Sequence, residues 1–239
     1  AIHPATVTPD FNPLAPLTNV VELLRHVDDE RVQHAHAILK RQTTQLVRLV
    51  DDLMDASRIA SGKIDLQRAP ARLQDILMDA VTNAGAALRS AQHELNIDVP
   101  DRSVWVDADA VRLTQVFCNL LNNAAKYTPR TGSITLSART DGHTVTVEVA
   151  DTGIGIAPEK LDEIFLMFTQ ATASATQKID GLGIGLWLAK TLIEMHDGRL
   201  VARSDGYGTG ATFTVRLPAV AAPAASLRIV SASGDAPSA

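Results

Sequence analysis

Three clusters of polar residues and glycines follow one another along the middle of the chain, and their residue types suit a phosphorylated, metal-bound ligand. They are Asn119-Leu120-Leu121-Asn122-Asn123-Ala124-Ala125-Lys126, Asp151-Thr152-Gly153-Ile154-Gly155 and Gly181-Leu182-Gly183-Ile184-Gly185. Each alone is weak evidence, because glycine-rich turns occur wherever a backbone needs a positive φ or a close approach. Together the three clusters predict a nucleotide site.

The first cluster supplies ligands for a cation and for phosphate. Asn119 and Asn123 are four residues apart on a predicted helix, so both carboxamides share one face. Their oxygens suit a hard cation such as Mg²⁺, which prefers oxygen ligands and keeps several waters. Lys126 follows within one turn, and its ammonium can reach phosphates as a point charge.

The second and third clusters supply a base contact and backbone amides. Asp151 follows an alternating apolar run that predicts a strand, so its carboxylate is fixed at a strand end, where it can accept hydrogen bonds from an adenine amino group. Gly153 and Gly155 let the chain turn beneath the base. The third cluster leads into a helix predicted over Leu186–Met195, and bare amides before a helix N-terminus favour an anion.

These clusters resemble the asparagine box and the first two glycine boxes of the histidine kinase ATP-binding domain. That domain belongs to a superfamily that also holds gyrase, mismatch-repair and heat-shock chaperone ATPases. Phe165-Leu166-Met167-Phe168 resembles the family's F box, and the segment 206–213 resembles its last glycine box and final strand. Residues 169–180 resemble the ATP lid by position, with a passive surface loop as the alternative. The resemblance covers roughly residues 13–218.

The resemblance implies ATP and Mg²⁺ as cofactors. Asn123 would hold Mg²⁺ with help from Asn119, Lys126 and the amides of 181–185 would hold phosphates, and Asp151 would recognise adenine. The full set of nucleotide-binding residues that it implies is Asn119, Asn123, Lys126, Tyr127, Asp151, Gly153, Gly155, Ile156, Phe168, Gly181, Leu182, Gly183, Ile184, Gly185, Leu186 and Thr212.

The chain divides near residue 62, and the part before it is helical. Apolar residues at helical spacing predict a first helix that ends near 27–29, and Leu39, Leu46 and Leu53 lie at heptad spacing in a second helix over about 30–60. Two such helices cannot bury both apolar stripes alone, so residues 17–60 are predicted to form a dimeric four-helix bundle. The alternative is an ordinary helical dimerisation segment or coiled-coil linker.

The whole chain is predicted to have an α+β fold. The helical hairpin (1–62) is followed by an α/β-sandwich ATP-binding domain (63–218) and then by a low-complexity tail or linker (219–239). Helices are expected over 73–90 and 109–125. A further helix should begin at about Ala157-Pro158-Glu159, and the last helix should end at Asp197-Gly198. Strands are expected over 94–98, 103–106, 133–139, 144–150, 199–204 and 211–217. The helices should cover one face of a mixed sheet.

The resemblance fails at the phosphoacceptor. Histidine kinases phosphorylate a histidine followed by glutamate, and counting back from the matching Asn12-Pro13-Leu14 places Thr8 and Pro9 there. A threonine hydroxyl is a poor nucleophile without a base, and Pro9 supplies none. The other N-terminal histidines, His3, His26, His34 and His36, are expected to be solvated surface residues. We therefore expect a chain that binds Mg-ATP but phosphorylates itself weakly or not at all.

The resulting interpretation is the histidine kinase core of a two-component phosphorelay, with phosphoryl transfer toward a response regulator receiver domain. One alternative is a degenerate dimeric scaffold that binds ATP structurally and docks a response regulator through the 18–27 face. Another is an ATPase of the chaperone or mismatch-repair branch. The heptad of Leu39, Leu46 and Leu53 argues against that branch.

Composition narrows the remaining classes. The chain has 239 residues, of which 46% are apolar, and a net charge of −5 with no basic run, so nucleic-acid binding is not expected. No apolar stretch approaches the roughly 18 residues that span a bilayer, and no targeting signal is visible. We expect no direct membrane insertion by this segment and a cytoplasmic location in a bacterium, with Cys118 as a buried core residue.

Overall fold

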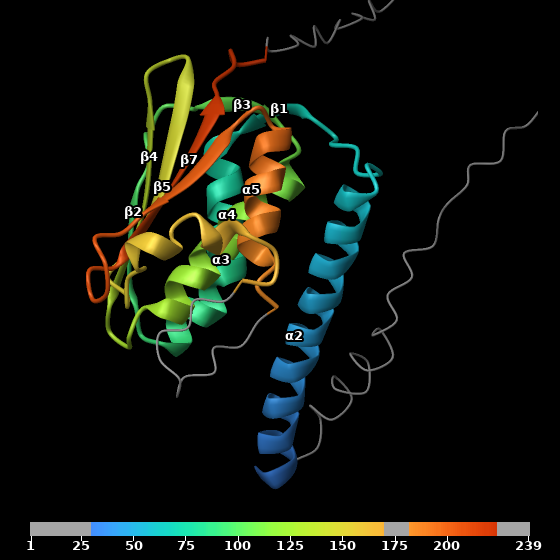
Figure 1. Cartoon of the computed structure of the whole chain (residues 1–239), viewed down its shortest axis with the longest axis vertical. Coiled ribbons are helices and arrows are strands. Elements are labelled where there is room, and N and C mark those ends of the chain that lie inside the picture. The colour runs from blue at the N-terminus through green and yellow to red at the C-terminus, as the bar shows by residue number, and fades with distance from the viewer. Residues whose placement is uncertain (1–29, 170–181, 224–239) are drawn as a thin grey trace, which may run out of the picture. The chain divides into compact units, whose positions relative to one another are not determined.

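The computed structural model describes residues 30–169 and 182–223 (Figure 1). The predicted first helix, Thr8, Gly181 and nearly all of the predicted lid lie outside the described residues. The described residues form two compact units. The first holds 30–65, 162–169 and 182–188, and the second holds 66–161 and 189–223.

The first unit contains α2 (Glu30–Ala60), a single helix with the predicted bounds. Its end is closed by Gly62, which has a φ of 64° and donates its N–H to the carbonyl of Ile59. The heptad leucines are partly exposed along this helix, with Leu39 at 44%, Leu46 at 48% and Leu53 at 51%. These three leucines of the predicted apolar stripe are therefore about half exposed in the structure.

The second unit is built on a five-stranded sheet with the strand order β2-β4-β5-β7-β6. Its strands are β2 (Glu94–Asp98), β4 (Ser133–Thr140), β5 (Thr144–Asp151), β7 (Ala211–Pro218) and β6 (Arg199–Arg203). Only β2 and β4 run parallel, and the other neighbours are antiparallel. A separate antiparallel pair joins β1 (Ala69–Arg72) to β3 (Trp105–Ala108).

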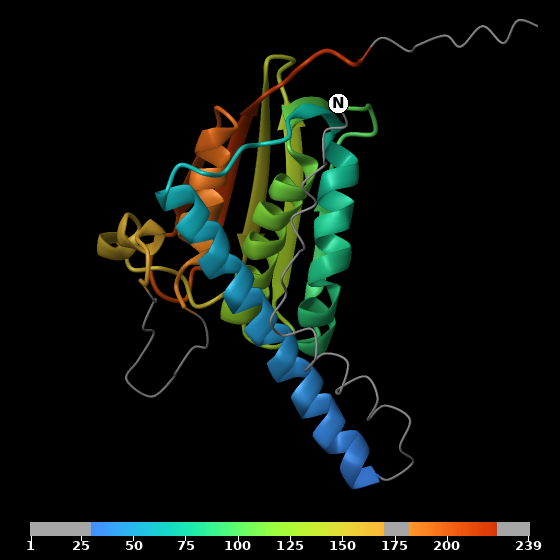
Figure 2. The same ribbon diagram turned by 90° about the vertical axis from the view of Figure 1, so that its right-hand side faces the viewer.

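Helices cover one face of this sheet in the second unit (Figures 1 and 2). They are α3 (Leu73–Ser90), α4 (Ala110–Tyr127) and the C-terminal part of α5 (Gly185–Met195). Alternate residues of β5 are buried, and Phe117, Leu120 and Leu121 of α4 are fully buried. Burying one such side chain stabilises a fold by about 1.5–3 kcal/mol, so this layer holds α4 and β5 in place.

The sequence placed most elements within one or two residues, with three differences. The strand expected over 103–106 lies at Trp105–Ala108, because its pairing partner β1 sets the register, with Ala71 opposite Val106. That partner was not predicted, since four residues with Pro70 among them give no strand pattern. The helix expected from Ala157-Pro158-Glu159 is a single 3₁₀ turn, Pro158–Lys160, followed by a second, Glu163–Phe165. In the described residues, no helix has the length and apolar character needed to cross a membrane.

Candidate functional site

Helix α4 positions the residues of the first cluster. It begins after Asp109, whose side chain accepts a hydrogen bond from the backbone N–H of Arg112 at 3.1 Å, as an N-cap does. Asn119 and Asn123 lie one turn apart and are both half-buried, whereas Leu120 and Leu121 beside them are fully buried. The helix therefore holds the two carboxamides at the edge of the core.

The three asparagines of α4 differ in what their amides bind. Asn122 donates to the carbonyl of Cys118 at 2.7 Å, so its amide is used within the helix, and Cys118 is buried as predicted. By contrast, Nδ2 of Asn119 is buried with no hydrogen-bond partner among the described residues. An unpaired buried donor costs about 1–3 kcal/mol, which a phosphate oxygen or a metal-bound water would relieve. The carboxamides at 119 and 123 thus fit a metal-bound phosphate ligand.

Lys126 and Tyr127 end the helix. The Lys126 ammonium lies over the Tyr127 ring, 5.0 Å from its centroid, and is exposed. Such a contact is worth only about 0.5–1 kcal/mol at an exposed site. The carbonyl of Tyr127 accepts the N–H of Ile154 at 3.1 Å, and burial raises the pKa of the Tyr127 hydroxyl. This bond joins the end of α4 to the second cluster.

Asp151 is the last residue of β5, where the sequence placed it. Its Oδ1 accepts the N–H of Gly153 at 2.8 Å. Burial raises the pKa of this carboxyl, while hydrogen bonds from the backbone amides of Gly153 and Ala211 lower it to a smaller extent. The result is a half-buried, oriented acceptor at the end of a central strand, as recognition of an adenine amino group requires.

Gly153 permits a close approach that no other residue would. A Cβ at this position would lie 2.6 Å from both Oδ1 of Asp151 and the carbonyl oxygen of Tyr127. Any side chain would push the carboxylate or the end of α4 aside. The glycine therefore keeps Asp151 and Tyr127 close together.

A loop after β6 supports the second cluster, and its anchor was missed in the sequence. The hydroxyl of Ser204 accepts the N–H of Ile156 at 2.9 Å and donates to the carbonyl of Gly210 at 2.7 Å. Gly208 also donates to the carbonyl of Ile154 at 2.7 Å, and Gly210 donates to that of Gly153 at 3.1 Å. Ser204 lies two residues before Gly206, where the last glycine-rich segment begins, and that position was the only signal available in the sequence.

The strand register separates Thr212 from Asp151. Asp151 pairs with Ala211, and Thr212 pairs with Ala150 and Arg203. Because side chains alternate across a strand, those of Asp151 and Thr212 lie on opposite faces of the sheet. The geometry favours Ala211, through its backbone, over the Thr212 side chain as a neighbour of the Asp151 carboxylate.

The remaining predicted residues belong to the first unit. Phe168 has a left-handed φ of 66°, is 63% exposed, and donates its N–H to the carbonyl of Gly183 at 3.1 Å. This joins the predicted F box to the third cluster. Ile184 is buried, Leu182 is 41% exposed, and α5 begins at Gly185, with Leu186 half-buried in its first turn.

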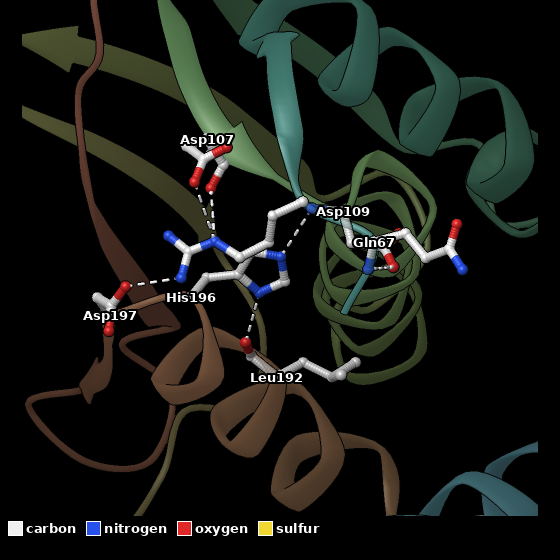
Figure 3. A network of polar contacts seen from close by, with 7 residues as sticks. Gln67, Asp107, Asp109, Leu192, His196 and Asp197 are labelled. Atoms are coloured by element: carbon white, nitrogen blue, oxygen red, sulfur yellow. Dashed lines mark hydrogen bonds and ion pairs between the residues drawn. The ribbon is translucent and has the colours of Figure 1, made fainter. Parts of the chain in front are cut away.

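A buried histidine ties the start of α4 to the end of α5, and no sequence pattern indicated it. His196 is 1% exposed, accepts the N–H of Asp109 at Nε2 and donates from Nδ1 to the carbonyl of Leu192 at 2.7 Å (Figure 3). Burial lowers its pKa. The second carboxylate oxygen of Asp109 accepts the N–H of Gln67 at 3.1 Å. The helix that carries Asn119 and Asn123 is thus fixed at its N-terminus from two sides.

Among the described residues, His, Cys, Asp and Glu side chains do not form a metal centre by themselves. Across 30–169 and 182–223, no group of three His, Cys, Asp or Glu side chains could hold a metal ion. A cation at Asn119 and Asn123 would therefore need ligands from a bound nucleotide and from water, which is how Mg²⁺ commonly binds.

The chain is similar to known proteins in sequence and in fold. Residues 108–221 match the family described as histidine kinase-, DNA gyrase B- and HSP90-like ATPase. The chain is 37% identical over 199 residues to the non-motile and phage-resistance protein of Caulobacter vibrioides, covering 81% of this chain and 24% of that protein. It is 35% identical over 178 residues to the histidine protein kinase DivJ of the same organism, covering 74% of this chain and 30% of DivJ.

The chain thus spans about a quarter to a third of the length of these curated relatives, 24% and 30%. Among solved structures, full-length ShkA in complex with AMPPNP superposes with a TM-score of 0.70 at 28% identity, over 89% of this chain and 44% of that one. The matched domain, the relatives and the shared fold identify this chain as a member of the sensor histidine kinase family with an ATPase domain of the histidine kinase type.

Proposed function

We propose that the chain binds Mg-ATP and forms the ATP-binding core of a two-component histidine kinase that directs phosphoryl transfer toward a response regulator. The observation that carries the proposal is the Asp151 carboxylate, half-buried at the end of β5 and oriented by the Gly153 amide. Burial raises the pKa of this carboxyl, so its ionised form costs free energy in the fold, which favours a ligand-binding role at this position.

We assign roles to three residues of α4. Asn123 would hold Mg²⁺, and the buried donor of Asn119 would meet a phosphate oxygen or a metal-bound water. Lys126 would leave the Tyr127 ring for a phosphate. When bound, Mg²⁺ would neutralise phosphate charge. Phosphoryl transfer at such a site proceeds mainly by positioning and charge neutralisation. The roles of Phe168 and of 182–186 remain predictions from the family resemblance.

We further propose that the chain does not phosphorylate itself at the usual position. Thr8 and Pro9 stand where the resemblance requires His and Glu, so neither an imidazole nucleophile nor a carboxylate base is present. Bound ATP would then donate its phosphoryl group to an acceptor at another position. Alternatively, the chain would be the dimeric scaffold that binds ATP structurally.

A homodimer through α2 is part of the proposal. Leu39, Leu46 and Leu53 are each close to half exposed on the single chain. A heptad of half-exposed leucines favours packing against a second copy, because knobs-into-holes contacts would remove these side chains from water.

Calorimetric titration with ATP, with and without Mg²⁺, tests the binding proposal. We expect saturable binding that strengthens with Mg²⁺, and the absence of saturable uptake by the folded protein would refute it. Incubation with labelled ATP, followed by separate acid and base treatment, tests the second proposal. Phosphohistidine is acid-labile and phosphothreonine is not, so strong acid-labile label would show that self-phosphorylation occurs on a histidine.

A further inference from the structure

The sheet face opposite the helices carries a group of arginines on β6 and β7. The register places Arg199 directly opposite Arg216, Val201 opposite Thr214, and Arg203 opposite Thr212. The intervening residues Leu200 and Val215 are buried in the core. The arginines therefore lie on the outer face, where all three are exposed.

These arginines line a hollow of about 210 Å³, with Val201 and Thr214 between them. Their backbones pair within the sheet, but none of the three guanidinium groups has a hydrogen bond or an ion pair with another residue in the described part of the chain. Arg199 and Arg216 are direct cross-strand neighbours, and like charges in that relation destabilise a sheet. An uncompensated arrangement of this kind favours an anionic partner over a structural role.

The surroundings limit the positive patch to this hollow. Glu148 of β5 lies at its border, where it accepts the Thr214 hydroxyl at 3.1 Å. Farther along the same face, Arg139 is paired with Asp98 at 2.7 Å, so its charge is already neutralised. Among the described residues of this sheet face, the arginines without an ion pair thus lie on β6 and β7.

We propose that this hollow, formed by Arg199, Val201, Arg203, Thr214 and Arg216, docks an extended acidic segment of a protein partner. One end holds two guanidinium groups and the other end holds one. Arg199 and Arg203 are four residues apart on a strand, hence about 13 Å apart at the backbone. An extended peptide with carboxylates four residues apart has the matching spacing.

Two observations favour a short acidic peptide over a nucleic acid. The chain has a net charge of −5, and the Glu148 carboxylate borders the patch, so a long polyanion would be repelled beyond the hollow. In addition, β6 is the terminal strand of the sheet in the described part of the chain. An extended segment can therefore approach from the edge without displacing a strand.

Fluorescence anisotropy with a labelled peptide of alternating Asp and Val residues tests this proposal. We expect the wild type to bind it in low salt, and the double variant Arg199→Gln/Arg216→Gln to bind at least about tenfold more weakly. Arg203→Gln, at the other end, should also weaken binding. The matched control is Arg139→Gln, which removes the same charge from the same sheet face and should bind as the wild type does.

Three results would overturn the proposal. One is equal peptide binding by the wild type and the double variant. Another is a peptide with Asn in place of Asp that binds equally well. The third is single-stranded DNA of the same charge that binds as tightly as the peptide, which would indicate unselective anion binding. Titration with ATP separates this surface from the proposed nucleotide site, because each variant should keep the wild-type ATP affinity.

Thermal unfolding of the variants distinguishes docking from a structural role. Removing a like-charge pair should leave the midpoint of the double variant unchanged or raise it. A clearly lower midpoint for both the double variant and Arg203→Gln would show that the arginines support the fold and would contradict the proposal.

Discussion

The backbone N–H of Asp109 donates to Nε2 of His196 over 3.0 Å, although the two residues are 87 positions apart. Since Nδ1 of the same ring donates to Leu192, the imidazole must be neutral to accept this bond. Asp109 caps the helix that carries Asn119 and Asn123. Protonation of the His196 ring would therefore break a hydrogen bond at the N-terminus of the helix that carries Asn119 and Asn123.

We expect the free energy of unfolding to fall as the pH drops below about 6.5, the ordinary pKa of histidine. Burial, and to a smaller extent Arg68, lower the pKa of His196 in the folded chain, while the hydrogen bond to Leu192 and the charges of Asp109 and Asp197 act in the opposite direction. Below about 6.5 the unfolded chain takes up a proton that the folded chain does not, so stability declines by up to about 1.4 kcal/mol per pH unit. Above that pH the contribution is fully present.

Urea unfolding at pH 7.5 and 5.5 measures this dependence. His196→Gln should lose stability at both pH values and show a smaller difference between them. His143→Gln, in the exposed hairpin turn, is the control and should keep the wild-type difference. An unaltered pH difference in His196→Gln would show that another group is responsible.

The glycine loop after β6 offers a test of close packing against β5. Gly210 has a φ of 74°, and a Cβ there would overlap the carbonyl oxygen of Asp151. Gly208 has a similar φ of 81°, but a Cβ there would meet open space. Gly208→Ala should therefore cost only the left-handed strain of about 1–2 kcal/mol. Gly210→Ala should cost more and also weaken nucleotide binding, because it displaces Asp151. Equal losses in denaturant unfolding would show that the overlap is relieved without strain.

Ser204 should act as a positioning residue for the segment after Asp151. Ser204→Ala leaves the Ile156 N–H without its acceptor, a loss of about 1–3 kcal/mol, and should weaken ATP binding by freeing this segment. Ser204→Thr retains a hydroxyl and should restore most of the affinity. Ser137→Ala, a half-exposed serine on β4, should stay within about 0.5 kcal/mol of the wild type. ATP affinity that is unchanged in Ser204→Ala would assign the serine to stability alone.

The sequence predicted the elements with a regular apolar period and the residues next to them. The heptad in α2 and the alternation in β5 gave correct elements, and the strand before Asp151 placed that carboxylate. The His196 and Ser204 contacts join segments 87 and 48 residues apart, so no local pattern encodes them. The sheet face on which the Thr212 side chain lies depends on the register between β5 and β7. The sequence of one strand does not reveal that register.

Asp151→Asn should separate binding from stability. The asparagine oxygen can still accept the Gly153 N–H, but the charge that adenine recognition uses is lost, so ATP affinity should fall by more than about tenfold. Because burial raises the pKa of Asp151, its ionised form destabilises the folded chain at neutral pH, and stability should be unchanged or higher in the variant.

Asp141→Asn is the opposite case and serves as the control for Asp151. Its carboxylate accepts the amides of His143 and Thr144, which lower its pKa, so its charge stabilises the fold above a pH of about 3.8. This variant should lose stability and keep ATP affinity. Calorimetry and urea unfolding on both variants give the comparison. Wild-type ATP affinity in Asp151→Asn would remove Asp151 from the site.

The neighbouring residues Asn122 and Asn123 of α4 provide a test of whether Asn123 binds Mg²⁺, with Asn122 as the control. Asn123→Ala should abolish most of the strengthening that Mg²⁺ gives to ATP binding, because the carboxamide oxygen at the cation is removed. Asn122→Ala deletes an amide of the same size whose hydrogen bond goes to Cys118, so it should lower stability by about 0.5–1.5 kcal/mol while the Mg²⁺ effect stays. Titrations with ATP in Mg²⁺ and in EDTA measure the difference. If both variants respond to Mg²⁺ as the wild type does, Asn123 does not hold the ion, and the cation contact must be sought at Asn119.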